Sequence, residues 1–184
     1  MVVYLYVLGA ILFRILPHPW NATPLAAMFL FSGALFKRKS VSLLVPLAAL
    51  LVSDYAVDLL IYHGAFPWFS PITWIGFLMI GMLGWTLRGK LAGKFNWLRI
   101  GGASVVGSTL FFLFTNFGWM WWTKLSMYPH TMMGLTECYA AGIPFYMNDL
   151  IGDLAWNAVM FGSYYWLTRR SRHSRISAST AEAN

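Results

Sequence analysis

Apolar residues run along the chain in six blocks, separated by short stretches of polar and charged residues. The blocks cover 2–16, 24–36, 41–62, 72–87, 100–122 and 150–167. A hydrocarbon core of roughly 30 Å takes about 20 helical residues to cross, with some tolerance for tilt. The pattern therefore predicts an all-α membrane protein, a bundle of six transmembrane helices that forms a single domain over residues 1–168.

The block at 24–36 is the shortest, because 13 residues at about 1.5 Å each reach only roughly 20 Å. Its start is well marked, since Asn21 and Thr23 are good N-cap residues and Pro24 suits a first helical turn. The block is short, tilted or re-entrant, and whether it fully spans stays open at this point.

Basic residues orient the predicted bundle. They cluster after the second block, between the fourth and fifth, and after the sixth: Lys37, Arg38, Lys39, Arg88, Lys90, Lys94, Arg99, Arg169, Arg170, Arg172 and Arg175. With six spans all of these share one face, leaving Arg14 and Lys124 opposite, so that face and both termini are predicted to be cytosolic. Five spans would fit the charge rule equally well.

Residues 169–184 form a basic cytosolic tail without apolar periodicity and are expected to be disordered.

Composition supports a lipid environment. The chain has 59% hydrophobic and only 10% charged residues, with a mean hydropathy of +0.60, which is outside the usual range of soluble domains. A net charge of +7 would suggest nucleic acid in a soluble protein. Here the charges sit at the ends of apolar blocks, so we expect the lipid bilayer as a partner and no nucleic acid.

Polar side chains inside apolar blocks are expensive in lipid and are the first candidates for function. Arg14 ends the first block, Asp54 and Asp58 lie four residues apart in the third, and Thr115 and Asn116 lie in the outer half of the fifth. The last begins with Asn148 and Asp149, followed by Asp153 and Asn157. All fall at similar depth, so they predict a pocket that opens to the outside and takes a small solute.

The candidate substrate-binding residues are Arg14, His18, Asn21, Asp54, Asn116, Asn148 and Asp153. Arg14 is expected to meet an anionic group, while amides and carboxylates fix polar edges of the ligand. His18 and Asn21 lie in a loop with three prolines within eight positions, which makes it rigid.

Other interpretations remain open. Arg14 with Asp54 or Asp153 can form a buried ion pair that fixes helix register, and Asn116 can join two helices, as in an assembly factor without a ligand. An intramembrane hydrolase or transferase could use His18 or His130 with a carboxylate. Since catalytic, phosphate-loop and dinucleotide motifs are missing and no metal-ligand spacing appears, we expect no enzyme activity, cofactor or metal.

Several motifs resemble a bacterial family of unknown function whose members are described as candidate transport proteins. They are Arg14-Ile-Leu-Pro17-His18-Pro19-Trp20-Asn21-Ala-Thr23-Pro24, Ser53-Asp54, Thr115-Asn116-Phe117, Tyr128-Pro129, Cys138-Tyr139, Ile143-Pro144-Phe145 and the stretch from Asn148 to Asp153. The resemblance covers roughly residues 14–162. It implies a multi-pass protein of the bacterial cytoplasmic (inner) membrane.

That family is similar in architecture to the substrate-binding S components of energy-coupling-factor (ECF) vitamin transporters. The similarity implies six helices, cytosolic termini, uptake of a vitamin or cofactor precursor, and a lid formed by the loop between the first two helices. It also implies a membrane scaffold subunit and paired ATPases as partners. The first block lacks the Ala-x-x-x-Ala pattern through which S components often dock, so operation without a scaffold remains an alternative.

Overall fold

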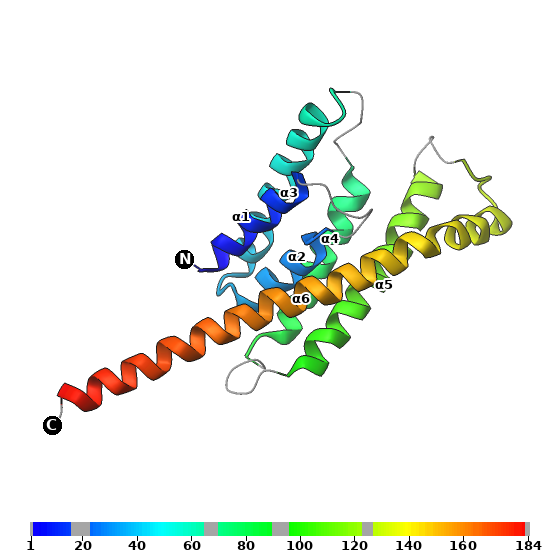
Figure 1. Cartoon of the computed structure of the whole chain (residues 1–184). Coiled ribbons are helices and arrows are strands. Elements are labelled where there is room, and N and C mark those ends of the chain that lie inside the picture. The colour runs from blue at the N-terminus through cyan, green and yellow to red at the C-terminus, as the bar shows by residue number, and fades with distance from the viewer. Residues whose placement is uncertain (1, 16–22, 65–69, 90–95, 123–126, 183–184) are drawn as a thin grey trace.

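The computed structural model describes residues 2–15, 23–64, 70–89, 96–122 and 127–182. These residues form six α-helices and one 3-10 turn, and they contain no β-strand (Figure 1). The elements are α1 (Val2–Ile15), α2 (Leu25–Leu35), α3 (Lys39–Leu60), α4 (Pro71–Gly84), η1 (Trp85–Leu87), α5 (Trp97–Trp122) and α6 (Met132–Glu182). The predicted all-helical class is therefore confirmed, and each of the six apolar blocks contains a helix.

The shortest helix, α2, lies at the centre of the molecule. It contacts each of the other five α-helices, and nine of its 11 residues are buried. Phe31 shows how it is enclosed, because its ring lies 5.0 Å from those of both Tyr6 on α1 and Phe161 on α6. On another side of α2, Phe29 stacks on Phe77 of α4 at 5.5 Å. Aromatic rings at these separations attract one another beyond simple contact.

Glycines allow α2 and α4 to approach backbone to backbone. A Cβ atom added to Gly84 of α4 would lie 2.5 Å from the carbonyl oxygen of Leu30 and 2.9 Å from the Cα of Gly33. A Cβ on Gly33 would in turn overlap the carbonyl oxygen of Gly81. Small residues serve this purpose in membrane helices, where packing rather than the hydrophobic effect drives association.

The end of α2 is fastened by Arg88, which follows η1. Its Nε donates to the carbonyl of Gly33 at 2.8 Å, and one terminal nitrogen donates to the hydroxyl of Ser42 at 3.1 Å. Trp85 Nε1 also donates to Ser42 Oγ, at 3.0 Å. These bonds hold the turn between α2 and α3 against the end of α4.

Helix α6 is longer than the sequence suggested. The apolar pattern predicts the last helix over 150–167, preceded by an outer loop over 123–148 with room for a short interfacial helix in its middle, and residues 169–184 were expected to form a disordered tail. In the structure, α6 runs through both regions from Met132 to Glu182 and contains Pro144. The apolar period is absent there, but Ala, Arg and Glu have high intrinsic helix propensity. Pro144 does not end the helix, although an interior proline removes a hydrogen bond and costs about 3 kcal/mol or more.

Two helices among the described residues, Lys39–Leu60 and Trp97–Trp122, are long and apolar enough to cross a membrane. In each, only 28% of the most apolar window is buried, whereas the core helix of a soluble protein is mostly buried. Leu44, Val52 and Leu60 of α3 are each about 60% exposed. The other apolar helices, Leu5–Arg14, Leu25–Leu35 and Pro71–Leu87, are shorter.

We expect Gly84→Ala to destabilise the protein, because the new methyl group would meet backbone atoms of α2 that cannot rotate away. Overpacking of this kind costs roughly 1–3 kcal/mol. The thermal unfolding midpoint of the detergent-purified protein should fall by several degrees. Gly102→Ala is the matched control, since a Cβ at Gly102 meets nothing within 4 Å. Equal midpoints in the two variants would contradict the close α2–α4 crossing.

Candidate functional site

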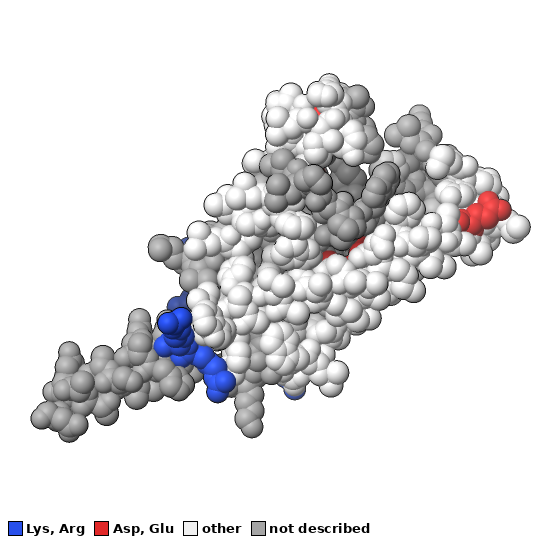
Figure 2. All heavy atoms as spheres, in the orientation of Figure 1, with Lys and Arg blue, Asp and Glu red and all other residues white. Residues whose placement is uncertain are grey.

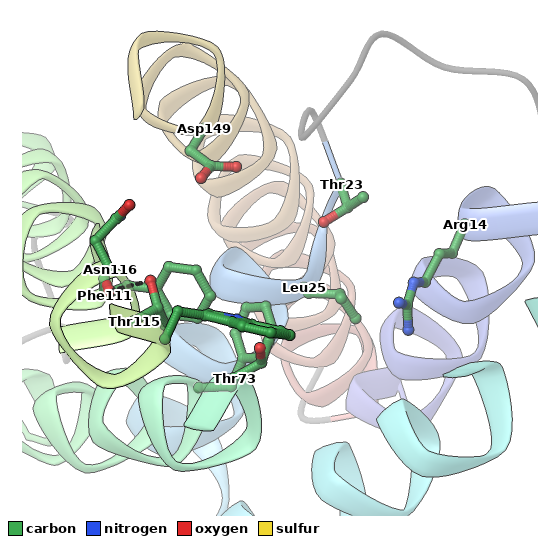
Figure 3. Close-up of a pocket in the computed structure, with 10 residues that line it drawn as sticks. Arg14, Thr23, Leu25, Thr73, Phe111, Thr115, Asn116 and Asp149 are labelled. Atoms are coloured by element: carbon green, nitrogen blue, oxygen red, sulfur yellow. Dashed lines mark hydrogen bonds between the residues drawn. The ribbon is translucent and has the colours of Figure 1, made fainter. Parts of the chain in front are cut away.

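A cavity of about 420 Å³ lies among α1, α4, α5, α6 and the start of α2. Its polar wall consists of Arg14, Thr23, Thr73, Thr115, Asn116 and Asp149, and its apolar wall consists of Leu25, Phe77, Phe111 and Trp119. Figure 3 shows Asp149 and Arg14 on opposite sides of this space, with Thr23 between them. The volume and the mixture of aromatic and polar walls are typical of sites for small molecules.

The cavity lies at the helix ends that are remote from the basic clusters. Arg14 belongs to the last turn of α1, Leu25 begins α2, and Thr73 and Trp119 lie in the first turn of α4 and the last turn of α5. Lys and Arg side chains instead gather at the opposite end of the molecule, as Figure 2 shows. The same view shows acidic atoms within a hollow of the surface.

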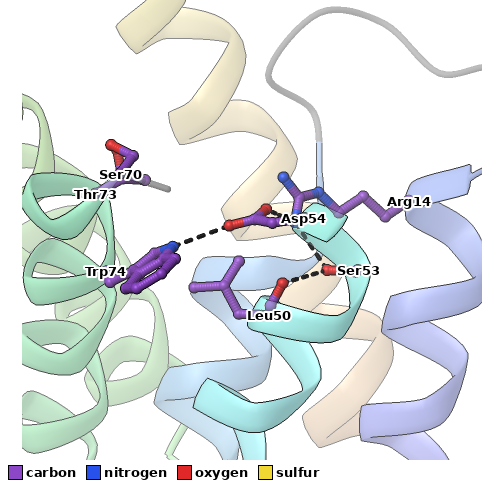
Figure 4. Close-up of polar contacts among 7 residues, drawn as sticks. All are labelled: Arg14, Leu50, Ser53, Asp54, Ser70, Thr73 and Trp74. Atoms are coloured by element: carbon purple, nitrogen blue, oxygen red, sulfur yellow. Dashed lines mark hydrogen bonds and ion pairs between the residues drawn. The ribbon is translucent and has the colours of Figure 1, made fainter. Parts of the chain in front are cut away.

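Arg14 is held by α3. Its guanidinium forms an ion pair with Asp54 and donates to the hydroxyl of Ser53 at 2.8 Å. The other carboxylate oxygen of Asp54 accepts a hydrogen bond from Trp74 Nε1 of α4 at 2.9 Å. Figure 4 shows Asp54 between these two partners. One carboxylate therefore joins three helices, and the predicted role of Arg14 as an anion receptor competes with this pairing.

The polar side chains of α5 are partly used within their own helix. Thr115 Oγ1 donates to the carbonyl of Phe111 at 2.8 Å, and Asn116 Nδ2 donates to the carbonyl of Phe112 at 2.9 Å. The amide oxygen of Asn116 faces Cys138 of α6, with 3.7 Å between Sγ and Oδ1. Thr115 can therefore still offer its hydroxyl oxygen as an acceptor, whereas Asn116 keeps one N–H donor.

A buried polar seam joins α5 to α6 below the cavity. Ser108 Oγ donates to Asp153 Oδ2 at 2.6 Å, and Asn157 Nδ2 donates to Ser104 Oγ at 3.0 Å. Asp153 and Asn157 are both buried. Asp149 lies one helical turn before Asp153 and lines the cavity. Among the described residues it forms no hydrogen bond or ion pair.

The structure brings together some of the predicted site residues. Arg14 and Asn116 line the cavity, and Asp54 contacts it only through Arg14. Asp153 lies in the seam with Ser108, while Asn148 is exposed and does not line the cavity. His18 and Asn21, together with the proline-rich loop expected to act as a lid, lie outside the described residues.

Sequence reasoning missed Thr73 and the aromatic wall, and it did not connect Thr23 with the cavity. Asp149 belonged to the predicted polar cluster but not to the candidate substrate-binding residues, although it precedes Asp153 by four residues and shares its helix face. Nothing in the sequence distinguished Thr73 or Phe111 from ordinary packing residues.

Among the described residues, the histidine considered for catalysis and the free cysteine lie in different surroundings. His130 is exposed, with its ring 5.6 Å from that of Trp121, whereas Cys138 is buried beside Asn116. Within the described part of the chain, no group of three or more His, Cys, Asp or Glu side chains is placed to hold a metal ion.

Fold and cavity together define an all-helical protein with a polar and aromatic cavity at one end of its bundle and two helices able to cross a membrane. The chain belongs to DUF6580, a family of unknown function, whose model matches residues 1–176. The expected membership of a family of unknown function is thereby confirmed. Neither the curated proteins nor the solved structures contain a match to the chain.

Removing either partner of the Arg14–Asp54 pair should destabilise the protein. The remaining charged group would keep only a neutral hydrogen-bond partner, Ser53 for Arg14 or Trp74 for Asp54, in a largely buried position. Breaking a buried pair costs about 3 kcal/mol or more. Arg14→Met and Asp54→Leu should each lower the thermal unfolding midpoint of the purified protein.

The double variant Arg14→Met/Asp54→Leu tests whether the two residues act as a pair. It should recover a large part of the loss, because no unpaired charge remains. Additive losses in the double variant would show that the two side chains contribute separately.

Proposed function

We propose that the protein is a multi-pass protein of the cytoplasmic membrane that captures a small solute in the cavity lined by Arg14, Asn116 and Asp149. The cavity carries this proposal, since its walls come from five helices and combine polar groups with aromatic rings. Polar groups at membrane depth that share a cavity are typical of solute sites.

Exposure of apolar side chains supports placement in a bilayer. Leucine, valine and isoleucine side chains cover the outer faces of α1, α3, α5 and α6, with Leu8, Leu44, Leu110 and Ile151 as examples. Monomeric soluble proteins rarely expose continuous apolar surface on this scale. We propose that all six helices lie in the membrane, with short α2 supported inside the bundle.

The charge distribution supports one orientation. Basic residues next to α3, η1, α5 and the middle of α6 gather at one end (Figure 2), which the positive-inside rule assigns to the cytosol. The cavity, at the opposite end, then faces the periplasmic side, and both termini are cytosolic. Since the sequence has no phosphate-binding loop, uptake would draw on the solute's own gradient or on a scaffold subunit with ATPases.

This topology predicts the behaviour of fusions. Alkaline phosphatase attached after Gly64, between α3 and α4, should be active, because that site is periplasmic in the proposed orientation. Fusions after Arg38 and after Asn184 should be inactive as phosphatase, and fluorescent protein at the same two sites should fluoresce. An active phosphatase at Asn184 would contradict the proposed orientation.

Solute capture predicts a retained ligand. Native mass spectrometry of the detergent-purified protein should show the chain with an additional small mass that collisional activation removes. Asn116→Leu should reduce the retained fraction about tenfold or more, because an apolar side chain would replace a polar group in the cavity wall. Its midpoint of thermal unfolding should change less than that of the Asp54 variant.

Thr109→Val is a matched control on the same helix. Thr109 contacts Tyr146 at 2.9 Å rather than the cavity, so the retained fraction should match that of the unmodified protein. Absence of any retained mass, or equal retention in the Asn116 and Thr109 variants, would contradict capture in this cavity.

A further inference from the structure

The ionisable groups in the described wall of the cavity are unevenly paired. Arg14 is the cation in the wall, and its charge is already matched by Asp54. Asp149 is the other ionisable group in the wall, and among the described residues it has no hydrogen-bond or ion-pair partner. Figure 3 shows its carboxylate directed toward the space between α5 and the start of α2. The described wall and the partner of Arg14 therefore leave one carboxyl group, that of Asp149, without a charged partner.

Helix dipoles do not remove this imbalance. Two helix N-termini, those of α2 and α4, reach the cavity through Leu25 and Thr73. Two C-termini, those of α1 and α5, reach it through Arg14 and Trp119. Each end contributes about half an elementary charge, positive at N-termini and negative at C-termini, so the four contributions largely cancel.

The hydrogen-bonding groups point to the same ligand chemistry. The hydroxyl hydrogen of Thr115 is directed to a carbonyl of its own helix, which leaves the hydroxyl oxygen as an acceptor. When it is ionised, the carboxylate of Asp149 offers acceptors and no donor. A protonated amine carries donors and no acceptor, and it is the group that matches such a wall.

Aromatic rings form the rest of the lining. Phe77 and Phe111 pack against each other with their ring centroids 4.6 Å apart, and Trp119 also lines the cavity. Ring faces attract ammonium groups by cation–π interaction, and they also accept the apolar part of a ligand.

We propose that the solute is a small organic cation, with an amine facing Asp149 and an apolar or aromatic part against Phe77, Phe111 and Trp119. This proposal rests on the proposed function and specifies the class of substrate for the same cavity. A volume of about 420 Å³ lies at the lower end of the range for small-molecule sites, so the ligand is smaller than most drugs.

Three probes with one skeleton test the charge requirement: phenethylamine, 2-phenylethanol and phenylacetate. Each is added at millimolar concentration to protein in dodecyl maltoside and phosphate buffer, because Tris is itself an organic cation. Phenethylamine should raise the thermal unfolding midpoint, and equilibrium dialysis should show it bound, whereas the alcohol and the carboxylate should have no effect. Stabilisation by phenylacetate instead, or by none of the three probes, would overturn the proposal.

Variants locate the binding. Asp149→Asn should weaken phenethylamine binding about tenfold or more, because a charged hydrogen bond is lost. Glu137→Gln removes the same charge from an exposed position on the same helix and should bind phenethylamine like the unmodified protein. Equal weakening in both variants, or in neither, would show that Asp149 does not hold the amine.

The retained ligand separates this proposal from the proposed function. The compound released by denaturing the purified protein is passed over a cation exchanger at neutral pH. Retention on the exchanger supports an organic cation. If the protein releases a compound that does not bind the exchanger, the organic-cation proposal is overturned and solute capture stands. If the protein releases no compound, the result counts against solute capture itself.

Discussion

The backbone contact between α2 and α4 is the constraint on which the rest of the bundle depends. Gly33 and Gly84 leave no room for a side chain between the two helices, and α2 can lie at the centre only because α4 comes so close. The other helices then pack around this pair, with Phe31 filling the space between α1 and α6. In lipid, where apolar side chains gain little by avoiding the solvent, such fit supplies the stability.

The cavity follows from the length of α2. Eleven residues rise roughly 16 Å, whereas the 22 residues of α3 and the 26 of α5 rise about 33 and 39 Å. A central helix that stops short leaves part of its longer neighbours without contact to it. Thr23 and Leu25, at the start of α2, accordingly line the cavity. The block that looked weakest as a membrane span therefore ends at the cavity.

Much of the fold was predictable, because six apolar blocks marked six helices. The extent of α6 was not, since helix propensity without apolar periodicity looks like a loop. For the site, Arg14 and Asn116 were found because polar groups in apolar helices are conspicuous. Asp149 and Asp153 share a helix face, and only the crossing of α5 and α6 decides that Asp153 meets Ser108 while Asp149 reaches the cavity. The position of a residue relative to a helix crossing depends on tertiary packing, which the sequence pattern does not show.

The central position of α2 bears on how the chain is assembled during synthesis. In a bilayer, a helix of 11 residues is too short to be stable by itself, and α4, which provides its closest contact, emerges from the ribosome some 40 residues later. In the membrane placement proposed above, the first segments would remain incompletely packed until α4 is made. Assembly would then involve several helices together rather than the insertion of one after another.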